Sequence, residues 1–129
     1  MKAILDTSAI IEYKRGSAKV AQIIEELDEF LTSSICAYEY LTGSNSAIQH
    51  DTKFLATMTP IPFTFADSQL AAKISRMLSK SGKGVNESDI LIYAQALRKS
   101  LAIVTLDKDF DKINSIVKGG LKILDPSGV

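Results

Sequence analysis

The sequence predicts an α/β fold: a three-layer α/β/α sandwich with a parallel sheet of about five strands between two layers of helices. Short apolar stretches, typical of buried strands, alternate along the chain with longer stretches whose apolar residues recur at helical spacing. The chain has 129 residues, which is enough for one domain with a substantial core and too few for two. We therefore expect a single domain over residues 1–129.

The charge balance narrows the function classes. Fifteen basic and fifteen acidic residues give a formal net charge of zero. The chain therefore lacks the strongly basic character of proteins that hold nucleic acid by charge alone. A nuclease is not excluded, because bound divalent ions would change the local field.

Cysteine content and hydrophobic runs indicate where the protein works. Cys36 is the only cysteine, so no internal disulfide can form, and a reducing compartment fits. The N-terminus leads directly into an apolar run that is too short for a signal peptide, and no run approaches the roughly 20 residues of a membrane span. We expect a cytoplasmic protein with no membrane segment.

The first half of the chain predicts two strands and four helices. The apolar run before Asp6 is the first strand, and the acid with the two hydroxyls after it begins a helix over residues 7–13. Helical spacing of apolar residues predicts a helix over residues 18–30, followed by a strand over 31–35. Ser33 or Ser34 caps the next helix, residues 36–41, which stops at Gly43, and a further helix covers residues 44–58.

The second half continues the alternation. Residues 59–63 contain two prolines and predict an edge strand. Residues 64–81 predict an amphipathic helix, and residues 81–85 a loop without the spacing of a phosphate-binding loop. A helix over 86–100, a strand over 101–105, a short helix to about residue 117 and a strand over 121–124 follow. The expected inner face of helix 64–81 consists of Phe65, Leu70, Ala71, Ile74, Met77 and Leu78.

Several acids follow strands or open helices in this layout. Asp6 and Asp107 each come directly after a strand, with Asp109 close behind. If the two strands are neighbours, their carboxyl ends lie about 5 Å apart. Asp89 falls in the first turn of the helix before the Asp107 strand, and Glu39 in the helix after the second strand. These acids can therefore meet at one edge of the sheet, where α/β proteins build their sites.

Each acid alone has a structural explanation, as a helix cap or a surface side chain. Together they are harder to explain, because crowded carboxylates repel one another and raise each other's pKa unless a cation lies between them. Oxygen ligands suit Mg²⁺ or Mn²⁺, and such an ion activates water and stabilises charge on a phosphate. The acids therefore point to a metal-dependent phosphodiesterase. Glu87, two residues before Asp89, competes with it for the third position.

The main basic strip lies on helix 64–81 and in the loop after it. It contains Lys73, Arg76, Lys80 and Lys83. Such a flank is usually a solvated helix face, but it is long enough to guide a phosphate backbone, so we name Arg76 and Lys80 as candidate RNA contacts. His50 is the only histidine, and no second ligand stands near it at a suitable helical spacing.

Four motifs in order resemble the PIN domain, and within it the VapC-type toxins of toxin–antitoxin pairs. They are ILDTS at residues 4–8, YEYLTG at 38–43, DILIYAQA at 89–96 and VTLDKDF at 104–110. No one motif is specific, but the ordered set covers essentially the whole chain. The resemblance implies a parallel sheet with strand order 3-2-1-4-5.

The resemblance also implies an activity and partners. It implies a Mg²⁺- or Mn²⁺-dependent endoribonuclease that hydrolyses RNA phosphodiester bonds, forms a homodimer and is blocked by a cognate antitoxin protein. The catalytic acids it implies are Asp6, Glu39, Asp89 and Asp107. The metal ligands among them are Asp6, Asp89 and Asp107, and the supporting residues are Thr7, Ser8, Thr105 and Asp109.

Three alternatives stay open at this point. A signalling receiver domain is also small, doubly wound and acidic, but it needs an acceptor aspartate after a mid-chain strand, and Asp51 lies in a predicted helix. A PIN-like domain can serve as a non-catalytic RNA-binding or assembly module. A PIN nuclease can also process RNA as housekeeping rather than act as a toxin. The sequence does not identify the RNA target, the number of metal ions or the antitoxin.

Overall fold

A five-stranded parallel sheet forms the centre of the computed structural model, which describes residues 1–82 and 84–128. The strand order is β3-β2-β1-β4-β5, so the predicted order 3-2-1-4-5 is confirmed. The strands are β1 (Lys2–Leu5), β2 (Glu29–Ser33), β3 (Thr59–Ile61), β4 (Ala102–Val104) and β5 (Ile123–Leu124). Strands β1 and β4 are neighbours, with Leu5 opposite Val104, so the residues after them emerge side by side.

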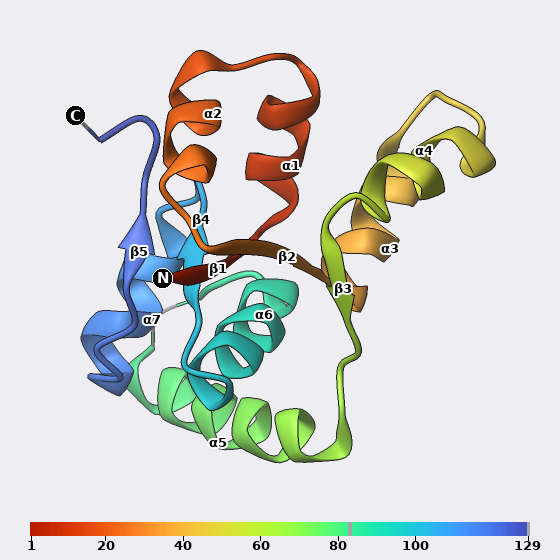
Figure 1. Ribbon diagram of the computed structural model, residues 1–129. Coiled ribbons are helices and arrows are strands. Elements are labelled where there is room, and N and C mark those ends of the chain that lie inside the picture. The colour runs from red at the N-terminus through yellow and green to blue at the C-terminus, as the bar shows by residue number, and fades with distance from the viewer. Residues whose placement is uncertain (83, 129) are drawn as a thin grey trace.

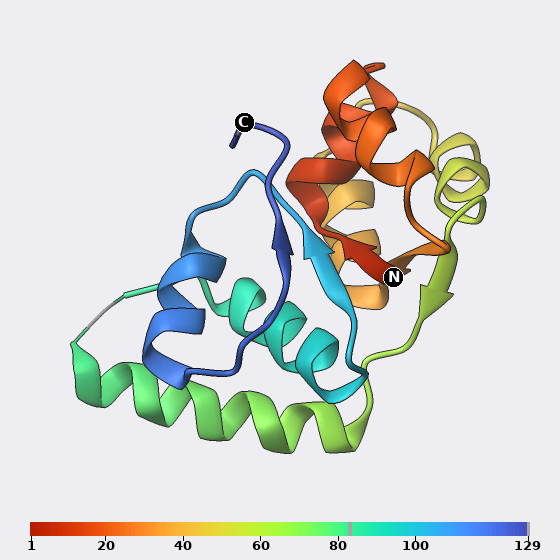
Figure 2. The ribbon, with the colours of Figure 1, turned by 60° about the vertical axis from the view of Figure 1, so that its left-hand side comes forward.

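Seven helices in the described residues cover this sheet (Figure 1). They are α1 (Thr7–Lys14), α2 (Ala18–Glu25), α3 (Ser34–Gly43), α4 (Ile48–Leu55), α5 (Phe65–Ser81), α6 (Glu87–Arg98) and α7 (Asp109–Val117). Figure 2 shows α5, α6 and α7 on one side of the sheet and α1 and α2 on the other. Helices α3 and α4 stand beside the β3 edge (Figure 1). This arrangement is the predicted three-layer α/β/α sandwich.

Side-chain caps fix where the helices begin. Asp6, Ser17, Ser33 and Asn86 each accept a hydrogen bond from a backbone N–H in the first turn of the following helix. Thr64 forms a full capping box with Asp67 at the start of α5. The expected cap at Ser33 is therefore confirmed, although α3 begins at Ser34 and not at residue 36 as predicted. The other capped helices begin within one residue of the predicted position.

Two predicted helices are too long. The helix expected over residues 18–30 ends at Glu25, because residues from Glu29 onward pair with β1 and so form β2. Strand β2 consequently starts two residues earlier than predicted and ends at Ser33. The helix expected over residues 44–58 covers only Ile48–Leu55, since β3 must begin at Thr59.

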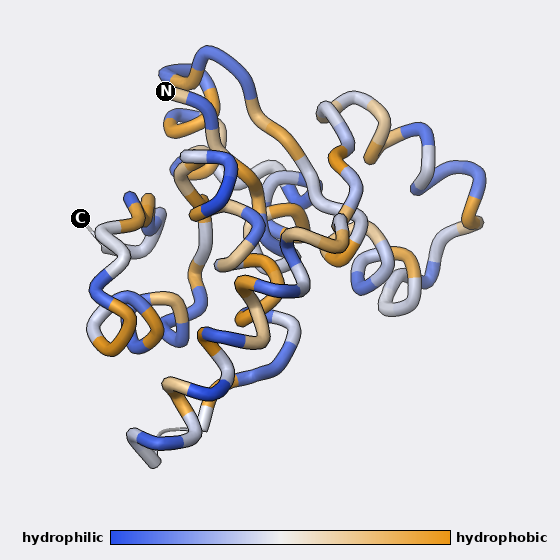
Figure 3. Tube along the Cα trace, turned by 90° about the horizontal axis from the view of Figure 1, so that it is seen from below, coloured by the Kyte–Doolittle hydropathy of each residue, from blue (hydrophilic) through white to orange (hydrophobic). Residues whose placement is uncertain are grey.

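The core is built by the strands and by the inner faces of the helices. Figure 3 shows hydrophobic and hydrophilic stretches alternating along the outer helices. Phe65 and Met77 were expected on the inner face of α5, but 79% of Phe65 and 43% of Met77 is exposed. Helix α6 is buried on more than one side, because it lies between the sheet and α5. Ile92 and Tyr93 on this helix are both buried.

Cys36 is buried, and burial raises the pKa of its thiol to about 12, so it is not a nucleophile at neutral pH. Within residues 1–82 and 84–128, every helix is too short or too polar to traverse a lipid bilayer.

Candidate active site

The site begins at Asp6, the first residue after β1. Its backbone N–H donates to the carbonyl oxygen of Val104 on β4 (3.1 Å), so the strand pairing brings it beside Thr105. Its Oδ1 accepts hydrogen bonds from Ser8 Oγ (2.7 Å) and from Ala9 N (2.9 Å), and its Oδ2 accepts one from Thr105 Oγ1 (2.5 Å). Asp6 is thus both the cap of α1 and a carboxylate fixed in one orientation.

Asp6 is only 3% exposed, and burial raises the pKa of its carboxyl above the ordinary value of 3.8. The hydrogen bonds from Thr105 and Ser8 act in the opposite direction, because they favour the charged form. The nearby Asp107 raises the pKa further by repulsion. The fold therefore holds a carboxylate where it is costly to ionise without a nearby cation.

The segment after β4 is held by the same hydroxyls. Thr105 Oγ1 accepts a hydrogen bond from Asp107 N (2.9 Å), and Ser8 Oγ accepts one from Leu106 N (3.0 Å). Asp107 Oδ1 in turn accepts from Asp109 N at 2.9 Å. These bonds fold residues 105–109 into a compact turn that presents two carboxyl groups at the sheet edge.

The third element is the first turn of α6, which carries Asp89. Its side chain is nearly buried, and its Oδ2 has no hydrogen-bond partner. The pKa of this carboxyl is raised to about 8, first by burial, then by the hydrogen bond that its protonated form can donate to Asp107, and by repulsion from Asp107, Asp6 and Asp109. Asn86 N donates to Asp109 Oδ2 (3.2 Å), which ties the start of α6 to the β4–α7 turn.

Three of these carboxylates are arranged as a cation site. One oxygen each from Asp89, Asp107 and Asp109 lies within 4.8 Å of the others. The unpartnered Asp89 Oδ2 and the raised pKa of that carboxyl fit a site that a divalent cation would complete. Hard oxygen ligands of this kind fit Mg²⁺ or Mn²⁺.

Glu39 reaches the same place from α3. Thr7 Oγ1 donates a hydrogen bond to Glu39 Oε1 at 2.7 Å, which links α1 to α3. Both side chains line a cavity of about 270 Å³ at the carboxyl edge of the sheet, and we call it the acid cavity. It is also lined by Asp6, Ser8, Ile11, Asn86, Ser88, Asp89, Ile92 and Asp107.

The acids named from the sequence thus come together in space. Asp6, Glu39, Asp89 and Asp107 line one cavity, together with Thr7 and Ser8, and Thr105 lies behind it bonded to Asp6. Asp109, expected only to support the site, belongs to the three-carboxylate cluster. Glu87, the competitor of Asp89, lines a different groove.

The expected RNA contacts lie elsewhere. Arg76 lines a groove of about 370 Å³ between α5 and α6 that shares no lining residue with the acid cavity. Lys80 is exposed near the end of α5, and Lys83 lies outside the described residues. Their part in RNA binding stays a prediction.

Sequence reasoning did not select Asn86, Ser88 and Ile92 as residues of the cavity. Asn86 was recognisable as the start of a helix, and Ser88 and Ile92 follow because the first turns of α6 face the cavity. The usable signal was the position of Asp89, since Asn86 and Ile92 stand three residues before and after it on the same face of the helix.

The chain matches the PIN domain family over residues 3–116, and it belongs to that family. Solved structures of toxin–antitoxin complexes share the fold. VapBC-1 from nontypeable Haemophilus influenzae gives a TM-score of 0.81 at 18% identity, covering 98% of this chain and 99% of that one. VapBC2 from Rickettsia felis, bound to a DNA fragment from its promoter, gives 0.80 at 18% identity, covering 97% and 98%.

A third neighbour is named for an activity. VapC20 from Mycobacterium tuberculosis, described as a sarcin-ricin loop cleaving toxin, gives a TM-score of 0.64 at 15% identity, covering 85% of this chain and 93% of that one. A search of curated proteins finds no match. At these identities the structural likeness shows the fold, and the PIN fold is typical of nucleases.

Proposed function

We propose that this protein is a Mg²⁺- or Mn²⁺-dependent endoribonuclease, the toxin of a type II toxin–antitoxin pair. The observation that carries the proposal is the convergence of Asp6, Glu39, Asp89 and Asp107 on one cavity, with the Asp89–Asp107–Asp109 cluster beside it. Membership of the PIN family and the toxin–antitoxin neighbours support it.

The carboxylates have separable roles in this proposal. Asp89, Asp107 and Asp109, with Asp6 adjacent, would hold the divalent ion. When bound, such an ion supplies Lewis-acid polarisation of the phosphate and neutralises the charge that develops there. Thr105 and Ser8 keep Asp6 in place, so its carboxylate does not have to reorganise when substrate enters.

Glu39 is the candidate proton acceptor. Thr7 fixes its Oε1, and the side chain lines the cavity without belonging to the three-carboxylate cluster. In the proposed step a water oxygen bonds to an RNA phosphorus, the bond from phosphorus to the leaving oxygen breaks, and a water proton passes to the Glu39 carboxylate.

The test is incubation of the purified protein with total RNA, with and without Mg²⁺ or Mn²⁺. We expect cleavage only with the metal, and none by an Asp6→Asn variant whose circular dichroism and thermal unfolding show an intact fold. Cleavage of equal rate by Asp6→Asn would overturn the mechanism.

The toxin role is tested separately from the chemistry. We expect a small neighbouring gene to encode a DNA-binding antitoxin, whose product binds a homodimer of this chain in the cytoplasm and blocks cleavage. Expression of the protein alone should stop growth, and co-expression of the neighbour should restore it. RNA cleavage without growth arrest would favour the housekeeping nuclease; no metal binding and no cleavage would favour a non-catalytic module.

The receiver-domain alternative is contradicted by the fold. Asp51 lies in α4 rather than after a strand, and its buried carboxylate oxygens have no hydrogen-bond partner. The strand order also differs from the 2-1-3-4-5 order of that class.

A further inference from the structure

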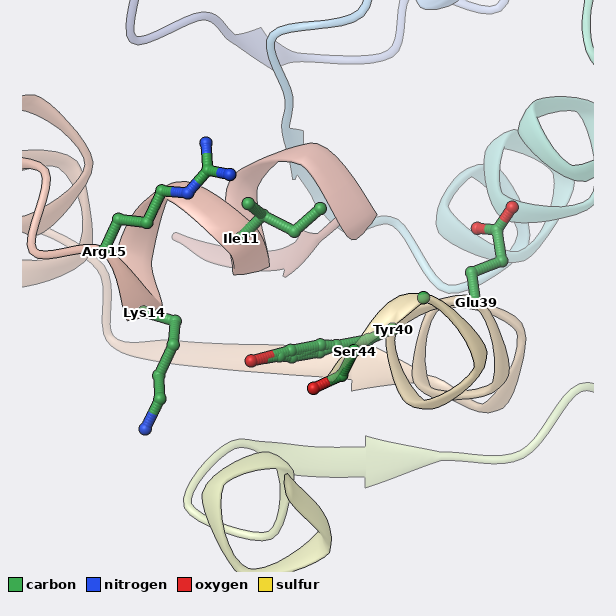
Figure 4. Close-up of a pocket in the computed structure, with 7 residues that line it drawn as sticks. Ile11, Lys14, Arg15, Glu39, Tyr40 and Ser44 are labelled. Carbon is green, nitrogen blue, oxygen red and sulfur yellow. The ribbon is translucent and has the colours of Figure 1, made fainter. Parts of the chain in front are cut away.

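A second groove continues from the acid cavity between α1 and α3 (Figure 4). Its volume is about 230 Å³, and it shares Ile11 and Glu39 with the acid cavity. Figure 4 shows Glu39 at one end, with its carboxylate directed towards α6. At the other end are Lys14 and Arg15, whose charged groups extend to opposite sides of the end of α1. We call this space the α1–α3 groove.

The two cations at the far end are available to a ligand. Lys14 is exposed, and its Nζ lies 4.8 Å from the centre of the Phe54 ring, which holds the ammonium by a cation–π contact. Among residues 1–82 and 84–128, Lys14 forms no salt bridge. Arg15 Nη1 lies 3.1 Å from Glu12 Oε1, but 71% of the Arg15 side chain is exposed, so it can still donate elsewhere.

The spacing suits a nucleic-acid strand that also reaches the acids. Thr7 lines the acid cavity, and Lys14 lies at the other end of the same helix. Seven residues of α-helix span about 10 Å. A stacked strand advances about 3.4 Å per nucleotide, so this length corresponds to about three nucleotides.

We propose that Lys14 and Arg15 form a phosphate subsite, which holds the RNA strand about two or three nucleotides from the bond that is cleaved. This inference rests on the proposed nuclease function. A phosphate strand is favoured over a protein segment because the groove leads from a cluster of phosphate-directed acids to a pair of exposed cations. Arg76 is a weaker candidate for this role, because its groove has no residue in common with the acid cavity.

The first test measures RNA binding. A labelled 12-nucleotide RNA of mixed sequence is titrated, by fluorescence anisotropy, into the Asp6→Asn protein and into the same protein carrying Lys14→Gln and Arg15→Gln. We expect affinity at low salt to fall about tenfold. Losing two phosphate contacts should also lower the slope of log K against log salt by about 1.4, since each contact on a single strand contributes about 0.7.

A matched control removes a cation at the far end of the molecule. Lys99 is exposed and caps the carboxyl end of α6, about 15 Å along the helix from Asp89. Lys99→Gln also changes the net charge, but it should leave the affinity and the salt slope unchanged.

A second variant blocks the groove without changing charge. Gly43 lines it, and a Cβ there would meet no heavy atom within 4 Å, so a larger side chain extends into open space. Gly43 is the last residue of α3, where leucine suits the helix better than glycine. We expect Gly43→Leu to weaken binding of the 12-nucleotide RNA, whereas Gly43→Ala has a smaller effect.

A small phosphodiester separates the subsite from the chemistry. Bis(p-nitrophenyl) phosphate is too short to reach Lys14 from the acids, so with Asp6 restored its Mg²⁺-dependent hydrolysis should be unchanged by Lys14→Gln/Arg15→Gln, while the KM for RNA rises. If Lys14→Gln/Arg15→Gln binds RNA with the affinity and the salt slope of the parent protein, the subsite is overturned. If the variant instead loses the binding of a protein partner, the groove belongs to that partner. Failure of the wild-type protein to hydrolyse either substrate would contradict the nuclease function. The RNA-binding measurement would still decide whether Lys14 and Arg15 contact the strand.

Discussion

Thr105 is the residue on which the geometry of the site depends most directly. Its hydroxyl donates to Asp6 Oδ2 and accepts from Asp107 N, so a single side chain sets the relative position of two acids. Thr105 is almost fully buried, so water does not readily replace its bond to Asp6.

We predict that Thr105→Val lowers stability by about 2 kcal/mol, because it leaves the buried Asp6 carboxylate and the partly buried N–H of Asp107 without this partner. RNA cleavage should fall as well, since Asp6 and Asp107 lose their shared anchor. Urea unfolding and cleavage rate measure the two effects. Thr105→Ser keeps the hydroxyl and should retain most of the activity; equal losses in both variants would mean that the methyl packing matters rather than the hydrogen bonds.

The carboxyl of Asp89 predicts a pH dependence. Its pKa in the folded chain is about 8, against 3.8 in the unfolded chain. Between these values the unfolded chain releases a proton that the folded chain keeps, so the metal-free protein should lose stability as pH rises from about 4 to 8. The raised pKa of Asp6 acts with the same sign.

Urea unfolding in EDTA at several pH values measures this decline. Asp89→Asn should flatten the profile, because the amide does not titrate. Saturating Mg²⁺ should restore stability near pH 8, where the ion binds the charged form. A profile identical in the wild type and Asp89→Asn would show that Asp89 is not the group responsible.

At the scale of elements, local signals in the sequence predict where helices begin. Pairing between distant strands decides where some of them end. Helix starts were predictable because cap residues act within one turn, as at Asp6, Ser33 and Thr64. The end of α2 was not, because Phe30 has the spacing of a helix but pairs with Ala3 in the sheet. That pairing depends on a strand almost 30 residues away, which no local pattern reports.

Burial on the helices shows the same limit. Phe65 is apolar and falls on the expected face of α5, yet this first residue of the helix is largely exposed. Ile92 and Tyr93 are buried because α6 has neighbours on more than one side. Apolar periodicity identifies one buried face of a helix, but it does not show how many other elements pack against that helix.

The connection from α7 to β5 contains a glycine that a close contact requires. A Cβ on Gly119 would lie 2.4 Å from Tyr93 Oη, which donates to Asn114 Oδ1 at 2.6 Å. We predict that Gly119→Ala destabilises the protein by about 1–3 kcal/mol, by displacing the buried tyrosine. Thermal unfolding measures it, with Gly84→Ala as the control because a Cβ at Gly84 meets nothing within 4 Å. Equal stability of the two variants would contradict the contact.

For the whole molecule, the sequence placed the acids on the right elements but did not specify their distances. Asp6 and Asp107 were predictable as neighbours, since both follow strands that pair in the sheet. Membership of Asp109 in the carboxylate cluster was not, because it depends on the turn that Thr105 and Asp107 form. The sequence also did not show that Glu87 and Asp89 line two different grooves, because this depends on how α6 is placed in the fold.

The central claim is that the carboxylates converge in order to hold a divalent ion. Titration of Mn²⁺, followed by electron paramagnetic resonance, tests it on the wild type, on Asp107→Asn and on Asp111→Asn, an exposed acid of α7 outside the cluster. We predict saturable binding to the wild type and to Asp111→Asn, and affinity weakened by about tenfold or more in Asp107→Asn. Equal Mn²⁺ binding by Asp107→Asn, or none by the wild type, would contradict the claim.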